Sequence, residues 1–201
     1  MKEKIAPGDV VLPDQFVDRT RHRPNTFFEG IGVVAHVELA DPVDAALQQA
    51  LYKAAVAVGA KTHRGGSYVC IEGPQFSTRA ESNLFRSWGV DVIGMTNMPE
   101  AKLAREAEMC YATIAMVTDF DCWHPDHDHV TVEAIIKVLL GNADNARALV
   151  KSVTPKLSGR EATCSAGCQT ALENAIITAP DARDAKMVEK LSAVAGRVLG
   201  D

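Results

Sequence analysis

Asp119 and Asp121 are the residues of this chain whose types and spacing most clearly suggest chemistry. They stand two positions apart in the run Thr118-Asp119-Phe120-Asp121, directly after an apolar segment. On an extended chain such side chains share a face, so the two carboxyl groups are expected to lie together. Close carboxyl groups do not readily ionise together, so one can stay protonated and donate a hydrogen bond while the other accepts. The alternative is that both merely cap a turn after a strand.

A purine base carries the complementary groups, because its N7 accepts a hydrogen bond and a 6-amino group donates one. Cleavage of the bond between sugar and base puts negative charge on the departing purine. A protonated carboxyl group at N7 would neutralise that charge as a general acid, an effect worth about 10²–10⁴-fold. Asp119 and Asp121 therefore predict a site for a purine nucleoside.

Two further segments place suitable side chains after apolar runs. Phe76 is suited to stack on a flat base and Ser77 to hydrogen-bond its edge, although a core Phe and a helix-capping Ser are the alternative. Met95 is suited to pack on a ribose. Thr96 offers a hydroxyl beside an expected helix N-terminus, where an anion is favoured, although a core Met and a capping Thr remain open.

Alternating strand and helix patterns must position these residues. Asp41 and Pro42 read as the cap and first residue of one helix, Thr78 and Glu81 as a capping box, and Gly65-Gly66 as a hairpin turn. The expected strands are 10–16, 32–37, 68–72, 91–95 and 111–117, and the expected helices are 42–58, 78–88, 99–108, 132–140, 142–153, 170–177 and 185–199.

This order predicts an α/β fold, a central mixed sheet flanked by helices, in a single domain over residues 1–201. Ligands of such sheets bind beyond the carboxyl ends of strands. The segments that begin at Gly73, Met95 and Thr118 are therefore expected to converge on one site.

Composition narrows the function classes. The chain has 201 residues, is 47% hydrophobic and 23% charged, and carries a net charge of −5. No basic patch suggests nucleic acid, and Arg19, Arg21 and Arg23 read as a solvated loop. The sequence shows no transmembrane run and no signal peptide, so a cytoplasmic protein without a membrane partner is expected.

Histidines and cysteines raise the question of a metal. The run 124–129 contains three His and two Asp residues and would suit a zinc hydrolase or deaminase, but it lacks a helical His-x-x-x-His and the paired-Cys signature. A polar loop at the mouth of the site is the favoured interpretation, and no metal is expected. Cys164 and Cys168 allow a local disulfide, but reduced thiols are favoured in the cytosol.

The segments already singled out resemble the methylthioadenosine phosphorylase family of the nucleoside phosphorylase superfamily. Three blocks carry the resemblance: 72–82 (Glu-Gly-Pro-Gln-Phe-Ser-Thr-Arg-Ala-Glu-Ser), 94–107 (Gly-Met-Thr through Arg-Glu-Ala), and 110–123 (Cys-Tyr-Ala-Thr through Trp). Weaker similarity covers nearly the whole chain.

The resemblance implies phosphorolysis of 5′-methylthioadenosine with inorganic phosphate as co-substrate and no metal or organic cofactor. It places Phe76, Ser77, Thr118, Asp119 and Asp121 at the base end of the substrate. It also implies that the remaining contacts are Met95 to ribose, Thr96 to phosphate, Val132 and Ile135 to the methylthio group, and His36 lent by a neighbouring subunit of a homo-oligomer, usually a trimer.

The family pattern also predicts what this chain lacks. Family members carry a further N-terminal third with a glycine-rich turn, an Arg-His pair that binds phosphate, and several strands. The fold is therefore expected to be incomplete at the N-terminus, with Thr96 as the remaining phosphate contact. Two alternatives follow: a chain that binds purines without turnover, or a phosphorylase that prefers methylthioinosine.

Overall fold

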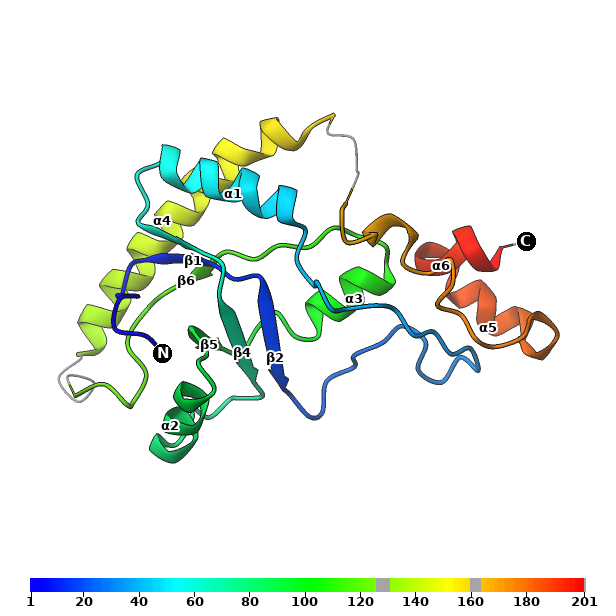
Figure 1. Cartoon of the computed structure of the whole chain (residues 1–201), viewed down its shortest axis with the longest axis horizontal. Helices are drawn as coiled ribbons and strands as arrows, with labels where there is room; N and C mark the ends of the chain where they lie inside the picture. The colour runs from blue at the N-terminus through cyan, green and yellow to red at the C-terminus, as the bar shows by residue number, and fades with distance from the viewer. Residues whose placement is uncertain (126–130, 160–163, 201) are drawn as a thin grey trace.

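The strands form two short sheets that meet end to end. The computed structural model describes residues 1–125, 131–159 and 164–200 (Figure 1). One sheet has the order β3-β1-β6 and the other the order β2-β4-β5. The strands are β1 (Val10–Leu12), β2 (Gln15–Arg19), β3 (Thr62–Arg64), β4 (Ser67–Ile71), β5 (Val92–Gly94) and β6 (Ala115–Met116).

A kink joins the two sheets. The pairs β1–β3 and β2–β4 are both parallel and have the same offset along the chain. Between them Gly65 N donates to Leu12 O at 2.8 Å and Asp14 N to Gly66 O at 3.0 Å. The hairpin predicted at Gly65-Gly66 is therefore wrong. The positive φ angles of +81° and +103° at these glycines bend a continuing strand instead of reversing it.

Helices cover the first sheet on one face. α1 (Ala45–Ala57) and α4 (Val132–Leu157) lie side by side above β1 and β6 in Figure 1. Leu12 of β1, Leu51 of α1 and Leu149 of α4 belong to one buried cluster. The apolar faces of both helices are thereby removed from water, which is the main stabilising contribution expected of such a layer.

Helix starts depend on which side chain reaches the first free N–H groups. The predicted capping box of α2 (Arg79–Ser87) is confirmed, with Thr78 and Glu81 bonded reciprocally. The predicted start of α1 is wrong by three residues, because Asp44 is the cap and its Oδ1 accepts from Leu47 N at 2.5 Å. α3 (Glu100–Glu106) is shorter than predicted.

The C-terminal third differs most from the predictions. α4 runs unbroken through residues 141–142, where two helices were expected. The expected helix 170–177 is replaced by turns and by η2 (Cys168–Thr170), while the expected strand 32–37 contributes an isolated bridge from Ala35 to Ile176. After η3 (Pro180–Ala182), the expected last helix is split into α5 (Ala185–Lys190) and α6 (Ser192–Leu199).

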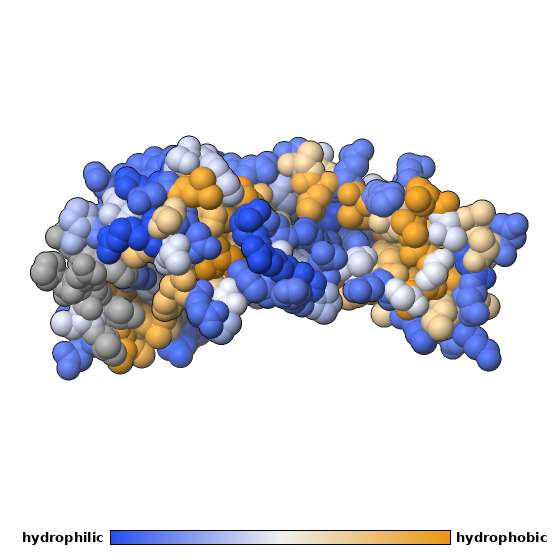
Figure 2. All heavy atoms as spheres, turned by 90° about the horizontal axis from the view of Figure 1, so that it is seen from below, coloured by the Kyte–Doolittle hydropathy of each residue, from blue (hydrophilic) through white to orange (hydrophobic). Residues whose placement is uncertain are grey.

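This C-terminal part forms the far end of an elongated molecule (Figure 1). Its own buried cluster joins Phe28 and Val33 to Leu172, Leu191 and Ala195. Seen from below, apolar surface gathers toward both ends, with more polar surface between them (Figure 2). No described helix has the length and apolar character that would let it cross a membrane.

Candidate active site

Seven of the predicted site residues share one cleft. A cavity of about 660 Å³ is bordered by Phe76 and Ser77 after β4, by Met95 and Thr96 after β5, and by Thr118, Asp119 and Asp121 after β6. The convergence expected from the carboxyl ends of strands holds for the parallel strands β4 and β5.

The segment that contains β6 reaches the cleft in another way. β6 pairs antiparallel with β1 in the other sheet, so the carboxyl end of this strand is not placed beside β5 by strand pairing. Instead, every residue from 113 to 121 borders the cavity. One extended segment therefore forms a continuous wall that leads to Asp119 and Asp121.

The two carboxyl groups have different surroundings. Asp121 accepts on both oxygens, from Ser82 Oγ at 2.6 Å and from Cys122 N at 2.9 Å. Asp119 Oδ1 accepts from its neighbour Thr118 Oγ1 at 2.7 Å. The surroundings of Asp121 favour an acceptor of fixed orientation, since two donors already point at it. A single local hydroxyl restrains Asp119 less.

Phe76 and Ser77, which follow β4, do not take the alternative roles of a core residue and a helix cap. Phe76 is 86% exposed, so it is not a core residue. Thr78, not Ser77, caps α2. Ser77 Oγ is buried and has no hydrogen-bond partner within the described part of the chain. Because buried polar atoms are normally paired, this hydroxyl is suited to a ligand in the cleft.

Close packing sets the position of Met95. Gly73, just after β4, has a φ of +70°, and a Cβ built on it would lie 2.7 Å from Met95 Sδ. Only glycine permits this approach of the loop to the Met side chain. Beside them the Tyr68 hydroxyl lies 3.4 Å from both Thr96 N and Thr96 Oγ1. Burial raises the pKa of Tyr68, although its contact with Thr96 lowers it in part.

The helix predicted to follow Thr96 forms, and α3 begins at Glu100, one residue later than expected. The Glu100 carboxylate accepts from Asn97 N at 2.6 Å. A side chain thus takes the position that an anion would need. Thr96 itself is exposed at the cleft, and its contact with phosphate stays a prediction.

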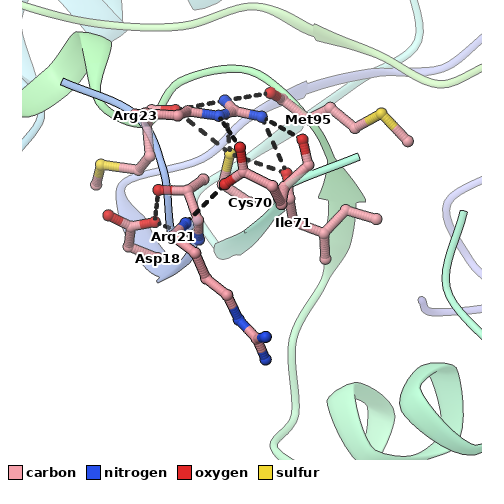
Figure 3. A network of polar contacts seen from close by, with 9 residues as sticks. Asp18, Arg21, Arg23, Cys70, Ile71 and Met95 are labelled. Atoms are coloured by element: carbon pink, nitrogen blue, oxygen red, sulfur yellow. Dashed lines mark hydrogen bonds and ion pairs between the residues drawn. The ribbon is translucent and has the colours of Figure 1, made fainter. Parts of the chain in front are cut away.

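Arg23 is a residue whose role the sequence did not reveal. Its Nη1 donates at 2.7 Å to both Met95 O and Met98 O, and its Nη2 donates to Glu72 O at 2.6 Å and Ile71 O at 3.3 Å (Figure 3). The interpretation of Arg23 as part of a solvated loop is therefore wrong. One guanidinium group ties the ends of β4 and β5 together, directly behind the segments that border the cleft.

The loop that carries Arg23 is itself held at several points. Arg21 N donates to Glu72 Oε2 at 2.6 Å, while the Arg21 guanidinium extends away from the network (Figure 3). Asp18 accepts from Thr20 Oγ1 at 2.7 Å and from Lys102 Nζ at 2.5 Å. A lone arginine in a polar loop gives no sequence signal of such contacts, because its partners are backbone carbonyls far along the chain.

Two buried polar residues on helices hold the segment 113–121 in place. Asn142 of α4 is 4% exposed and its Nδ2 donates to Val117 O at 2.9 Å. Ser82 of α2 is fully buried and bonds Asp121. The sequence signal for Asn142 was its spacing of seven residues before Leu149, which places a polar group on the buried face of the helix.

Of the other three predicted residues, one lies elsewhere and two have side chains outside the described residues. His36 borders a separate cavity of about 280 Å³ together with Arg105. It therefore does not enter the cleft of its own chain. Val132 and Ile135 belong to the first turns of α4, but their side chains lie outside the described residues.

The histidine-rich run 124–129, which we interpreted as a polar loop at the mouth of the site, is only partly described. Residues 126–130 fall outside the described ranges, and the ring of His124 stacks on Phe120 with 4.2 Å between ring centroids. Within the described residues, the one group suited to hold a metal is Cys110, Cys164 and Cys168, and none of them borders the cleft.

Comparison with known proteins identifies the family. The sequence profile of the phosphorylase superfamily matches residues 1–155. An S-methyl-5′-thioadenosine phosphorylase of Rhodospirillum rubrum is 59% identical over 200 residues, which are 100% of this chain and 68% of that protein. The chain belongs to the methylthioadenosine phosphorylase family.

Solved structures of the family share this fold. A methylthioadenosine phosphorylase from an antarctic soil metagenomic library superposes with a TM-score of 0.89 at 45% identity, covering 96% of this chain and 67% of that chain. Methylthioadenosine phosphorylase from Schistosoma mansoni in complex with adenine gives a TM-score of 0.78 at 29% identity, covering 88% and 69%. The α/β fold of a nucleoside phosphorylase is thereby confirmed, and this chain spans about two thirds of the length of these relatives.

Proposed function

We propose that this protein acts in the phosphorolysis of 5′-methylthioadenosine to adenine and 5-methylthioribose 1-phosphate. In this reaction the bond from C1′ of the sugar to N9 of the base breaks, and a phosphate oxygen bonds to C1′. The observation that carries the proposal is the single cleft that joins Phe76, Met95 and Asp119 in a chain 59% identical to a phosphorylase of that name.

The two carboxyl groups indicate where in the cleft the purine base binds. Asp121, already oriented by Ser82, accepts from the 6-amino group. Asp119, whose one partner among the described residues is Thr118, donates its proton to N7 as the bond to the sugar breaks. A 6-oxo purine would need a donor where Asp121 accepts, so methylthioadenosine is favoured over methylthioinosine. Phe76 covers the base and Ser77 bonds its edge.

One face of α4 indicates where the methylthio group of the substrate binds. Leu139 of α4 borders the cleft, and it lies four residues after Ile135 and seven after Val132. Residues with that spacing occupy one helix face. This placement supports the assignment of Val132 and Ile135 to the apolar methylthio pocket, with Met95 packed on the ribose.

The described residues of the cleft offer few groups that could bind phosphate. No Lys, Arg or His borders the cleft in the described ranges, and Thr96 is the contact we propose. A dianion held without a cationic side chain would be weakly bound and poorly aimed at C1′. This observation favours a second candidate function, in which the chain binds the purine without turnover.

The proposal includes the oligomeric state of the protein and its location in the cell. His36 lies away from its own cleft, so it can reach a methylthio pocket only in another copy, as in a homotrimer. We place the reaction in the cytoplasm, in purine and methionine salvage, without a metal or organic cofactor. Light scattering on the purified protein tests the trimer, and a monomer would remove His36 from the site.

Release of adenine from methylthioadenosine, measured by chromatography with and without phosphate, tests the function. Phosphate-dependent release confirms the phosphorylase. Calorimetry with adenine on the same sample separates the second candidate, which predicts binding without release. Methylthioinosine serves as the competing substrate, and faster cleavage of it would overturn the roles given to Asp119 and Asp121.

A further inference from the structure

Three cysteines gather away from the cleft. The sulfur atoms of Cys110, Cys164 and Cys168 all lie within 4.8 Å of one another. Cys110 follows α3, whereas Cys168 begins η2 in the C-terminal part of the chain. The cluster therefore lies where the sheet-bearing part of the molecule meets the part that carries α5 and α6 (Figure 1).

A turn brings two of these thiols together. Gly167 N donates to Cys164 O at 3.0 Å, and Gly167 has a φ of +64°. This turn places Cys164 Sγ 2.8 Å from Cys168 Sγ. A pair of cysteines separated by two to four residues on a tight turn is the usual half of a structural zinc site.

Polar side chains contact the cysteine cluster or the turn beside it. Gln169 Nε2 donates to Cys110 Sγ at 3.2 Å, as outer partners of metal ligands commonly do. Arg105 is 4% exposed, and it donates to Ala166 O at 3.0 Å, within the turn between Cys164 and Cys168. Three thiolates and one divalent cation carry a net charge of −1, and the buried carboxyl group of Asp44 lies beside Cys110. The buried guanidinium group offsets part of this negative charge.

We propose that Cys110, Cys164 and Cys168 together bind one Zn²⁺ ion, with solvent as the fourth ligand. Sulfur ligands select soft, tetrahedral ions such as zinc over magnesium or calcium. Binding displaces the three thiol protons into solvent. The ion ties the end of α3 to the turn before η2 and thereby fixes the C-terminal part to the sheet. This site is independent of the proposed reaction.

Metal content of the full chain, purified under reducing conditions, tests the site. We expect roughly one zinc per chain by elemental analysis, and a loss of most of it in Cys110→Ser, Cys164→Ser and Cys168→Ser. Cys122→Ser is the matched control, because Cys122 lies outside the cluster and should leave the zinc content unchanged. Full zinc retention in Cys110→Ser would overturn the three-cysteine site.

Cobalt gives a second readout that needs no variant to fold. Titration of the metal-free wild-type chain with Co²⁺ should give sulfur-to-cobalt charge-transfer absorption that saturates at about one equivalent. Absence of that absorption overturns the proposal. So does a mass two hydrogens lower under the same reducing conditions, since a disulfide between Cys164 and Cys168 would then occupy the two thiols.

Discussion

The hydroxyl of Ser82 donates a hydrogen bond of 2.6 Å to Oδ2 of Asp121. This bond joins α2 to the wall that follows β6, and it fixes one carboxylate oxygen while Cys122 N holds the other. The pair explains how the cleft can hold Asp121 in one orientation although the segment around it is not a strand.

Ser82→Ala should therefore lower adenine release by about tenfold while the fold survives. Loss of the hydroxyl leaves a carboxylate oxygen without its partner, which costs about 1–3 kcal/mol where the group is buried. The measurement is the rate of adenine release together with the melting temperature. Ser87→Ala is the control, since Ser87 is exposed on the same helix and its hydroxyl donates to Leu84 O, away from the cleft. Equal losses in both variants would contradict the role of Ser82.

Arg23→Lys should weaken adenine binding by roughly tenfold and lower the melting temperature. An ammonium group cannot replace a planar group that donates to several carbonyls on two segments. Calorimetry with adenine measures the effect. Arg21→Lys keeps the backbone N–H that bonds Glu72 and should change little. A lower melting temperature with unchanged adenine affinity would show that Arg23 supports the fold but not the cleft.

Asp119→Asn should reduce adenine release by about 10²–10⁴-fold, because an amide cannot supply the proton that N7 receives. The volume is conserved and Asn can still accept from Thr118, so the melting temperature should stay within a few degrees of wild type. Asp181→Asn, at an exposed position, is the control. If stability fell in step with activity, Asp119 would be a structural residue.

The lowered pKa of Asp9 predicts how the stability of the fold depends on pH. Burial raises its pKa, but hydrogen bonds from His63 at 2.7 Å, Lys61 at 2.9 Å and Ala6 N outweigh this and bring the pKa below the ordinary value of 3.8. A carboxyl group with a lowered pKa in the folded state stabilises the fold above its unfolded pKa. That contribution is lost as the pH falls through the folded pKa.

Asp9→Asn should thus lower the free energy of unfolding by about 1–3 kcal/mol at pH 7. The difference from wild type should shrink below the ordinary carboxyl pKa and vanish once Asp9 is protonated. Urea unfolding across this pH range measures it. Asp144→Asn, which removes an exposed pair with Arg147, should show almost no difference at any pH. A pH-independent loss in Asp9→Asn would contradict the argument.

The sequence by itself determined the local features and the candidates for the site. The capping box of Thr78 and Glu81 needs residues three apart, and both bonds are formed as predicted. The segments that begin at Gly73, Met95 and Thr118 each follow an apolar run, and all three reach the cleft. Such features depend on spacing within a few residues, where the chain geometry leaves few alternatives.

Only the tertiary structure decided which residues hold those segments in place. Arg23 meets Met95 and Met98, Ser82 meets Asp121, and Cys110 meets Cys164 across long stretches of chain. Asp44 displaced Asp41 as the cap of α1 because its own side chain reaches Leu47 N, while Arg105 takes up Asp41 O. Buried polar groups must find partners wherever the fold brings them, and a sequence pattern does not record pairs made by long-range packing.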